Sequence, residues 1–316
     1  MGEKIKIFAV VGPTASGKSG LALELARRHN GEIISCDSMQ VYKRMNIGTA
    51  KPTEEEMREI RHHLIDVVAP DRAFSCEDYV SLAAQAIEDC AGRGKTPIIC
   101  GGTGLYLDAL LRGGNSAPDA ETGEIRLALT KRAEEEGAAA LHGELSRVDP
   151  ESAAAIHPNN VKRVIRALEI FYSCGVPKSL LDKESQALQS PYEAKVIGLR
   201  YSDRELLYGR IEKRVDEMIA QGLLEETRAL MDEGVFEKNR TAAQAIGYKE
   251  LLGALCGAES IDSAVLKLKT ATRRYAKRQM TWFSAKAYVE WLDVLENGQI
   301  KRFEEIVNNA ERLFSL

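Results

Sequence analysis

The sequence has few of the features that mark secreted, metal-binding or membrane proteins. Its six cysteines form no Cys-x-x-Cys pair, and none lies at metal-finger spacing from a histidine, so we expect reduced thiols without disulfides or structural zinc. No uninterrupted apolar run approaches the roughly 20 residues that a membrane-spanning helix needs. The chain runs directly into a predicted strand, without a signal peptide. These absences predict a cytoplasmic protein that does not enter membranes.

An excess of positive charge is also missing. The formal net charge is −4 and the isoelectric point is about 5.9, so any nucleic-acid site must be a local basic patch. We find neither low-complexity segments nor internal repeats. A chain of 316 residues with 44% hydrophobic content predicts a substantial core in two domains, or in one domain with an insertion.

The most informative stretch that is present is a phosphate-binding pattern. The apolar run Ile5–Val11 leads into Gly12–Ser19, whose spacing is G-x-x-x-x-G-K-S, and the helical pattern Leu21–Ala26 follows. In such a loop successive backbone N–H groups point into one concavity, toward which the next helix aims its positive end. Lys18 adds a point charge, and the Ser19 hydroxyl can ligate Mg²⁺. The pattern predicts a receptor for two linked phosphates, with a chance glycine-rich turn as the alternative.

Two further predicted strands end in residues suited to ligand binding. Ile33 and Ile34 form a buried strand pattern, and Asp37 follows just past its end. Ile98–Cys100 leads into the glycine cluster Gly101–Tyr106, where backbone can approach a ligand closely. Ligands of open α/β sheets bind at the carboxyl ends of the strands. A turn residue is the alternative for the aspartate, and a tight strand-to-helix turn for the glycine cluster.

The middle of the chain departs from this alternation of strands and helices. Gly113–Asp119 contains glycine, asparagine, serine and proline, which indicates a linker, and Glu124–Leu188 shows helical patterns only. Val196–Leu199 returns to strand character. We therefore predict an α/β fold, a P-loop NTPase-like core with a parallel sheet flanked by helices, plus a small all-helical insertion domain. The core would comprise residues 1–113 and 190–316, and the insertion residues 114–189.

Basic residues gather on three predicted helices. The last of these, Ser260–Ser284, carries five cations within ten residues and few acidic residues nearby, which favours contact with a phosphodiester backbone. A solvated surface is the alternative for each helix. The basic residues are, in chain order, Lys162, Arg163 and Arg166 after the cap His157–Asn160, then Arg210 and Arg214, then Lys269, Arg273, Arg274, Lys277 and Arg278.

Taken together, the motifs resemble those of the bacterial tRNA dimethylallyltransferases, also called tRNA isopentenyl transferases. The matching stretches are Gly12–Ser19, Asp37–Tyr42, Asn46–Pro52, His62–Asp66, Gly101–Tyr106, Ile156–Asn160, Ala245–Glu250, Thr272–Gln279 and Thr281–Phe283. Two positions depart from the family pattern. Ser19 stands where threonine is frequent, and Ser284 stands where an arginine often follows Trp-Phe, which bears on one tRNA contact.

The resemblance implies transfer of a dimethylallyl group from dimethylallyl diphosphate to N6 of adenine 37, beside the tRNA anticodon, with release of diphosphate. Asp37 would take a proton from the weakly nucleophilic adenine amine. The loop, Mg²⁺ held partly by Ser19, and an arginine would stabilise the leaving diphosphate. The expected catalytic residues are Thr14, Lys18, Asp37, Arg210 and Arg214, and the expected diphosphate-binding loop is Gly12, Pro13, Thr14, Ala15, Ser16, Gly17, Lys18 and Ser19.

The resemblance also implies that the anticodon stem-loop of a tRNA is bound, with the target base extruded from its stack. Ser38, Gln40 and Thr103 would read or clamp that base. We expect a monomer. The complete set expected to contact tRNA is Asp37, Ser38, Met39, Gln40, Thr103, Arg126, Lys162, Arg163, Val164, Ile165, Arg166, Lys277, Arg278, Gln279, Thr281 and Trp282.

Two other functions fit parts of the sequence. A kinase for a small molecule or nucleoside would bind ATP at the same loop, and label transfer from γ-labelled ATP tests for it. A non-catalytic RNA-binding protein would need the basic helix but not Asp37, and it would bind RNA without modifying it.

Overall fold

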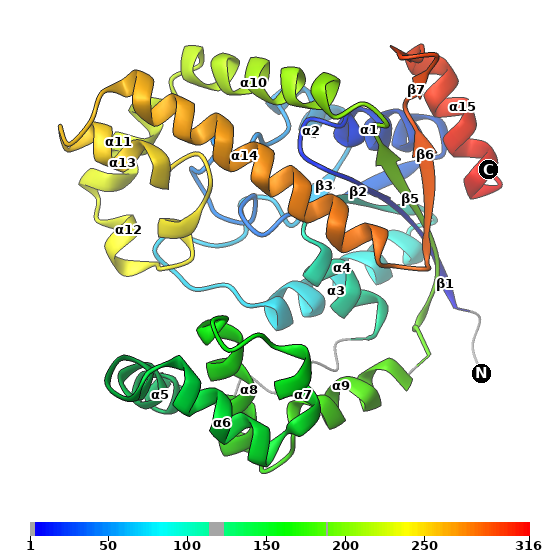
Figure 1. Cartoon of the computed structure of the whole chain (residues 1–316). Coiled ribbons are helices and arrows are strands. Elements are labelled where there is room, and N and C mark those ends of the chain that lie inside the picture. Colours follow the sequence, from blue (N-terminus) through cyan, green and yellow to red (C-terminus); the bar gives the residue numbers. More distant parts are fainter. Residues whose placement is uncertain (1–3, 114–122, 188) are drawn as a thin grey trace. The chain divides into compact units, whose positions relative to one another are not determined.

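The structure is a computed structural model that describes residues 4–113, 123–187 and 189–316. The chain divides into two compact units, Met1–Leu111 with Tyr192–Leu316 and, separately, Arg112–Pro191 (Figure 1). Residues 114–119 of the predicted linker lie outside the described part. Among the helices that the structure describes, none has the length and apolar character needed to cross a membrane.

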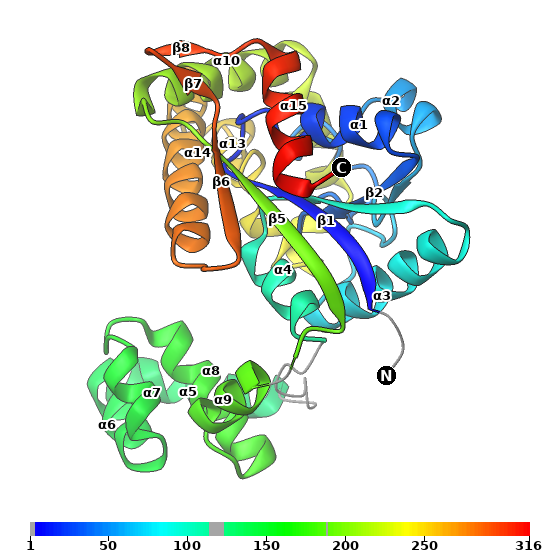
Figure 2. The ribbon, with the colours of Figure 1, turned by 90° about the vertical axis from the view of Figure 1, so that its right-hand side faces the viewer.

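A sheet of six parallel strands forms the centre of the first unit (Figure 2). The strand order is β3-β2-β4-β1-β5-β6, and all neighbours are parallel. Strands of such a sheet are covered on both faces, which is why they are continuous apolar runs. The predicted α/β class is confirmed. The strands are β1 (Ile5–Val11), β2 (Gly31–Cys36), β3 (His62–His63), β4 (Thr96–Gly101), β5 (Tyr192–Arg200) and β6 (Val289–Asp293).

Helices cover both faces of the sheet. Alternate residues of β1 point to opposite sides, so Phe8 and Val10 lie in one hydrophobic core while Ile7 and Ala9 lie in the other. The first core is shared with α1 (Lys18–Arg28) and α15 (Phe303–Phe314), and the second with α3 (Cys76–Gly92) and α4 (Gly104–Leu111). The phosphate-binding loop therefore lies between two packed layers, at the carboxyl end of a central strand.

A third core joins the later helices of this unit to the loop that follows β2. The helices α10 (Arg204–Ala220) and α14 (Ile261–Ser284) contact each other. Tyr42 and Met45, from the loop, are buried among residues of these helices. The remaining elements are α2 (Glu54–Glu59), α11 (Leu223–Asp232), α12 (Val235–Lys238), a 3₁₀ helix (Ala242–Gln244), α13 (Lys249–Leu255) and the hairpin β7 (Leu295–Glu296) and β8 (Gln299–Ile300).

The described residues of the second unit form helices joined by turns, without strands. Val164 and Ile165 are buried in its hydrophobic core. The sequence predicts that both residues contact tRNA; because their side chains are enclosed by the core, such a contact would have to come from their backbone. Its helices are α5 (Gly123–Glu136), α6 (Ala138–Val148), α7 (Pro150–Ala155), α8 (Val161–Cys174) and α9 (Lys178–Ala187).

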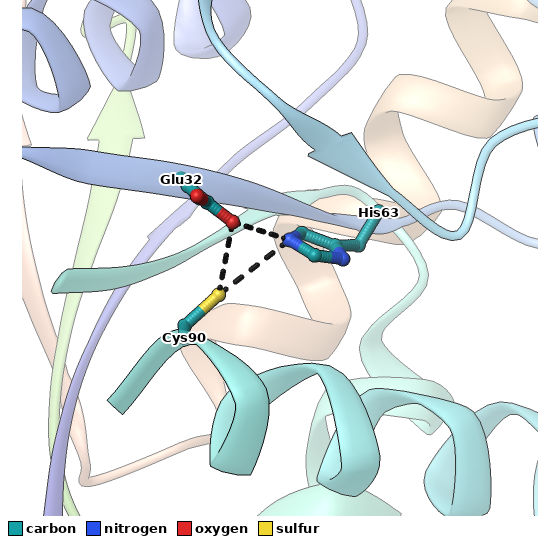
Figure 3. Close-up of side chains that lie close together, drawn as sticks. All are labelled: Glu32, His63 and Cys90. Atoms are coloured by element: carbon teal, nitrogen blue, oxygen red, sulfur yellow. Dashed lines mark hydrogen bonds and ion pairs between the residues drawn. The ribbon is translucent and has the colours of Figure 1, made fainter. Parts of the chain in front are cut away.

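A buried polar cluster ties β2, β3 and α3 together at the end of β2 remote from Asp37. His63 Nε2 lies 2.7 Å from Glu32 Oε2, and Cys90 Sγ lies 3.4 Å from the same oxygen (Figure 3). Arg93 donates to both Glu32 oxygens, at 2.5 and 2.7 Å. Arg93 holds the pKa of Glu32 down at about 2, whereas burial beside that carboxylate raises the pKa of Cys90 to about 12. With the carboxylate paired and the thiol protonated, the cluster is an ion-pair network that stabilises the fold.

The Glu32 network makes stability depend on pH. Because the folded-state pKa lies below the unfolded value of about 4.3, the ionised carboxylate stabilises the fold above pH 4.3, and this contribution is lost as the pH falls towards 2. The difference in unfolding free energy between the protein and Glu32→Gln should therefore shrink as urea denaturation is repeated from pH 7 downward. Glu59→Gln, which removes an exposed pair with Arg27, is the control and should change stability little. A pH-independent difference for Glu32→Gln would contradict this prediction.

Candidate active site

The loop Gly12–Ser19 has a backbone suited to binding phosphate. Gly12 and Gly17 adopt φ angles of 146° and 95°, which side-chain-bearing residues rarely adopt. Because α1 begins at Lys18, the positive end of this helix faces the loop. The Lys18 ammonium folds back over the loop and donates to the Pro13 carbonyl at 3.3 Å. The loop therefore combines backbone donors, a helix terminus and a cation.

Two side chains brace the loop from outside. The Tyr201 hydroxyl donates to the Ser16 carbonyl at 3.3 Å, and Arg210 Nε donates to the Ala15 carbonyl at 2.9 Å. The Arg210 guanidinium also lies over the Tyr201 ring, 5.9 Å from its centroid. Arg210 thus uses its Nε–H donor to hold the loop in place. The residue also lines the outer of two hollows beside the loop.

Two adjoining hollows meet at the loop. The inner one, a cavity of about 320 Å³, lies between the loop, the carboxyl ends of β2 and β4, and the helices α10 and α14. The outer one opens beside Arg210 and Lys213. Lys18, Ser19 and Arg214 line both. The inner cavity brings together the predicted site residues Thr14, Lys18, Ser19, Asp37, Ser38, Met39, Gln40, Arg214, Arg278 and Gln279.

The charges in the inner cavity favour an anionic ligand. Burial lowers the pKa of Lys18, and the nearby positive charge of Arg214 lowers it further. Burial likewise lowers the pKa of Arg214, while the Asp37 carboxylate opposes that shift. Burial has removed part of the hydration that stabilises the charges of Lys18 and Arg214. An anion bound between the two side chains would stabilise both charges again. A diphosphate is such an anion.

Asp37 follows β2 directly, as predicted, and it is both a turn residue and a wall of the cavity. Its Oδ1 accepts the N–H groups of Met39 at 2.8 Å and Gln40 at 3.3 Å. The Ser38 N–H donates to Thr103 Oγ1 at 3.0 Å, which ties this turn to the glycine cluster after β4. These bonds fix the carboxylate in orientation. A fixed, half-buried carboxylate in a cavity is suited to accept a proton.

The side chain of Gln40 is already engaged within the protein. Its Oε1 accepts from Ser35 Oγ at 2.8 Å, and its Nε2 donates to the carbonyls of Thr49 and Ala50, each at 3.2 Å. Both N–H donors are thereby used. Gln40 thus joins the cavity wall to the loop that contains Thr49 and Ala50, and its role in reading or clamping the base stays a prediction.

Gln279, another residue predicted to contact tRNA, lines the cavity and is also bonded within the protein. It is only 5% exposed; its Oε1 accepts the Thr14 N–H at 2.8 Å, and its Nε2 donates to the Gly102 carbonyl at 3.1 Å. A β-carbon at Gly102 would lie 2.0 Å from this Nε2, so the approach requires glycine. Gln279 therefore joins α14 to the phosphate-binding loop and the glycine cluster. The sequence signal was a polar residue in register with the buried residues Ala276 and Phe283.

Replacing Gln279 with methionine should destabilise the protein. The change keeps the side-chain length but leaves a partly buried N–H and a buried carbonyl without partners, which costs up to about 1–3 kcal/mol per group. We expect a lower midpoint of urea denaturation with an unchanged slope. Gln244→Met, at an exposed position, is the control, expected within about 0.5 kcal/mol of the parent. Equal midpoints for the parent and Gln279→Met would mean that the two bonds contribute nothing.

The basic patch expected on α14 is smaller than predicted. Lys269 pairs with Asp216 at 2.7 Å, and Arg273 pairs with Glu212 at 2.6 Å. Both acids lie on α10, so the expectation of few nearby acids is wrong for these two cations. Lys277, Arg278 and Thr281 are exposed, and Arg274 is exposed as well. The Trp282 ring packs so closely on the backbone of Gly104 that a β-carbon there would lie 2.2 Å from it.

In the second unit, the basic residues predicted to contact tRNA, Arg126 on α5 and three residues on α8, divide into two groups. Arg126 and Arg166 lie 2.8 and 3.0 Å from the same carboxylate oxygen of the buried Glu169. They cover a buried charge, which is a structural role. Lys162 and Arg163 are exposed, which leaves them accessible to a polyanion.

Known proteins are similar to this chain in both sequence and fold. The family described as IPP transferase matches residues 40–286. A tRNA dimethylallyltransferase of Geobacillus kaustophilus is 48% identical over 309 residues, covering 97% of this chain and 96% of the relative. The crystal structure of a tRNA isopentenylpyrophosphate transferase from Bacillus halodurans matches with a TM-score of 0.71 and 42% identity, covering 99% of this chain and 96% of that chain.

A eukaryotic dimethylallyltransferase, described in crystallographic snapshots as acting on tRNA, matches with a TM-score of 0.77 and 31% identity, covering 93% of this chain and 75% of its own. The family match spans well over half of the sequence, and the relatives align along nearly their full length. Together with the loop, the parallel sheet and the cavity, these matches establish that the chain belongs to the IPP transferase family.

Proposed function

We propose that this protein transfers a dimethylallyl group from dimethylallyl diphosphate to N6 of adenine 37 in tRNA and releases diphosphate. One observation carries the proposal: Lys18, within the phosphate-binding loop, and Arg214, on α10, line the same cavity as Asp37. The names of the relatives, tRNA dimethylallyltransferases of about half-identical sequence, support the choice of donor group and acceptor.

The reaction requires both the carboxylate and the cations that line this cavity. The exocyclic amine of adenine is a poor nucleophile because its lone pair is delocalised into the ring, and a carboxylate that removes its proton during attack raises the rate by about 10²–10⁴-fold. Asp37 is that base. On the other side, the bond from carbon to the bridging oxygen breaks and negative charge develops on the diphosphate. Lys18, Arg214 and the loop amides stabilise this charge.

Mg²⁺ fits the donor set of the cavity. Ser19 lines both hollows, and the diphosphate itself supplies the hard oxygen ligands that this ion prefers. Ser19 would hold the ion, which would neutralise part of the diphosphate charge. The tRNA would meet exposed basic residues on each unit, namely Lys277 and Arg278 on α14 and Lys162 and Arg163 on α8. We propose a monomer.

The test is direct. Unmodified tRNA is incubated with the protein, Mg²⁺ and dimethylallyl diphosphate, and the anticodon fragments are analysed by mass spectrometry. We expect one added dimethylallyl group on the fragment that contains adenine 37, and none when the diphosphate is omitted. Label transfer from γ-labelled ATP to a nucleoside or small-molecule acceptor, without prenylated tRNA, would instead support a kinase. RNA binding without either product would support a non-catalytic binding protein.

A further inference from the structure

Two sequence motifs near the cavity, Asn46–Pro52 and Ala245–Glu250, meet at one carboxylate that the chemistry above does not use. Glu226, on α11, accepts the backbone N–H groups of Asn46 at 3.0 Å, Ile47 at 2.9 Å and Gly48 at 3.1 Å. It also accepts the Tyr248 hydroxyl at 2.7 Å. Consecutive N–H groups that point at one anion form a nest, and here the anion is a side chain of the protein itself. Glu226 therefore fixes the conformation of residues 46–48.

Tyr248 completes this arrangement. Its ring lies so close to Gly48 that a β-carbon there would be 2.5 Å from the ring. Burial and the neighbouring Glu226 raise the pKa of Tyr248 well above its usual value, so the hydroxyl keeps its proton and remains a donor. At the other end of the segment, Lys51 Nζ donates to the Tyr42 carbonyl at 2.6 Å and to Asp66 at 2.5 Å. Residues 46–51 are thus held at both ends.

A chain of hydrogen bonds connects this segment to the proposed base. The carbonyls of Thr49 and Ala50, which line the cavity, accept the Gln40 side-chain amide. The backbone N–H of Gln40 in turn donates to Asp37 Oδ1. Glu226 does not line the cavity, so it can act on the reaction only through its neighbours: directly through Gly48, which lines the cavity, or through the bonds from Thr49 and Ala50 to Gln40.

We propose that Glu226 is a positioning residue, which orients Asp37 and the cavity wall around it through the segment 46–50. The proposal rests on the proposed function, in that its kinetic readout is prenyl transfer. Displacing a reacting group by about 1 Å costs as much as 10²-fold in rate, so a shift passed along these bonds is measurable.

The decisive variant is Glu226→Gln, which keeps the shape of the side chain but replaces one acceptor oxygen with a donor that opposes the N–H groups. We expect the single-turnover rate of prenyl transfer, with both substrates saturating, to fall by about tenfold or more. Affinity for inorganic pyrophosphate should stay unchanged, because the phosphate-binding loop is not touched. Glu225→Gln is the matched control, since it removes the neighbouring charge from the same first helical turn but lies exposed, and it should behave like the parent.

A second readout does not depend on catalysis. Hydrogen exchange should become faster at residues 46–48 and 37–40 in Glu226→Gln and stay unchanged in Glu225→Gln. Tyr248→Phe keeps the ring against Gly48 and removes one hydrogen bond to Glu226, so it should give a smaller increase in exchange at the same residues. This variant replaces Glu226→Gln in the test if Glu226→Gln does not fold. If the parent protein transfers no prenyl group, the proposed function is wrong. Hydrogen exchange then tests the positioning role by itself. Unchanged exchange, an unchanged rate, or loss of pyrophosphate affinity in step with the rate would overturn that role.

Discussion

Replacing Asp37 with asparagine is expected to lower the rate of prenyl transfer by about 10²-fold or more. The asparagine side chain keeps an oxygen for the N–H groups of Met39 and Gln40, so the turn after β2 should survive. What the variant loses is the ability to take a proton from the attacking amine. Binding of tRNA and of pyrophosphate should stay close to that of the parent, because Asp37 adds no positive charge for either polyanion.

The control for this prediction is Asp203→Asn. Asp203 forms the same kind of turn, accepting the Glu205 N–H at 2.8 Å at the start of α10, but it does not line the cavity. Single-turnover rates of both variants, measured with saturating tRNA and dimethylallyl diphosphate, separate loss of the base from loss of a turn. Parent-like turnover in Asp37→Asn would remove this residue from its proposed role.

Replacing Lys18 with methionine is expected to lower the transfer rate by about 10²–10³-fold, the usual cost of removing one group that stabilises charge developing in the transition state. The Lys18 ammonium lies within the loop and lines both hollows, and Arg214 is the other cation common to both. Methionine keeps the length of the side chain without the charge. Pyrophosphate affinity should fall as well, whereas tRNA affinity should not.

Lys213→Met is the matched control for the loss of a positive charge beside the loop. Lys213 lines only the outer hollow, is exposed, and lies 3.7 Å from Glu217, so its removal should change the rate little. If the two lysine variants lost equal activity, general attraction of polyanions would explain the effect better than stabilisation of a leaving group.

The parts of the site that the sequence predicted are those encoded in short stretches. The loop Gly12–Ser19 depends on its own glycines and on the strand and helix beside it, and Asp37 was located because it directly follows a predicted strand. The long helix α14 was predicted from its own apolar periodicity and is confirmed within one residue of its expected start. Local patterns of this kind are readable without tertiary contacts.

The parts that the sequence could not predict depend on contacts between distant segments. The bond from Thr14 to Gln279 joins residues 265 positions apart, and the nest around Glu226 joins residues about 180 positions apart. The same reason explains the errors at Lys269 and Arg273, whose acidic partners lie on α10. The sequence does not show whether a polar residue on a helix contacts solvent, an acidic side chain or a backbone carbonyl. Its partner depends on the tertiary fold.

The strand order also bears on how the chain folds during synthesis. β1 lies between β4 and β5, and the whole of Arg112–Pro191 is made before β5 leaves the ribosome. Translation of those residues takes roughly 4–16 s at 5–20 residues per second. During that interval β1 is the outermost strand of the nascent sheet, with one row of amides and carbonyls unpaired. The nascent chain therefore exposes, as a sheet edge, a strand that lies in the interior of the finished sheet.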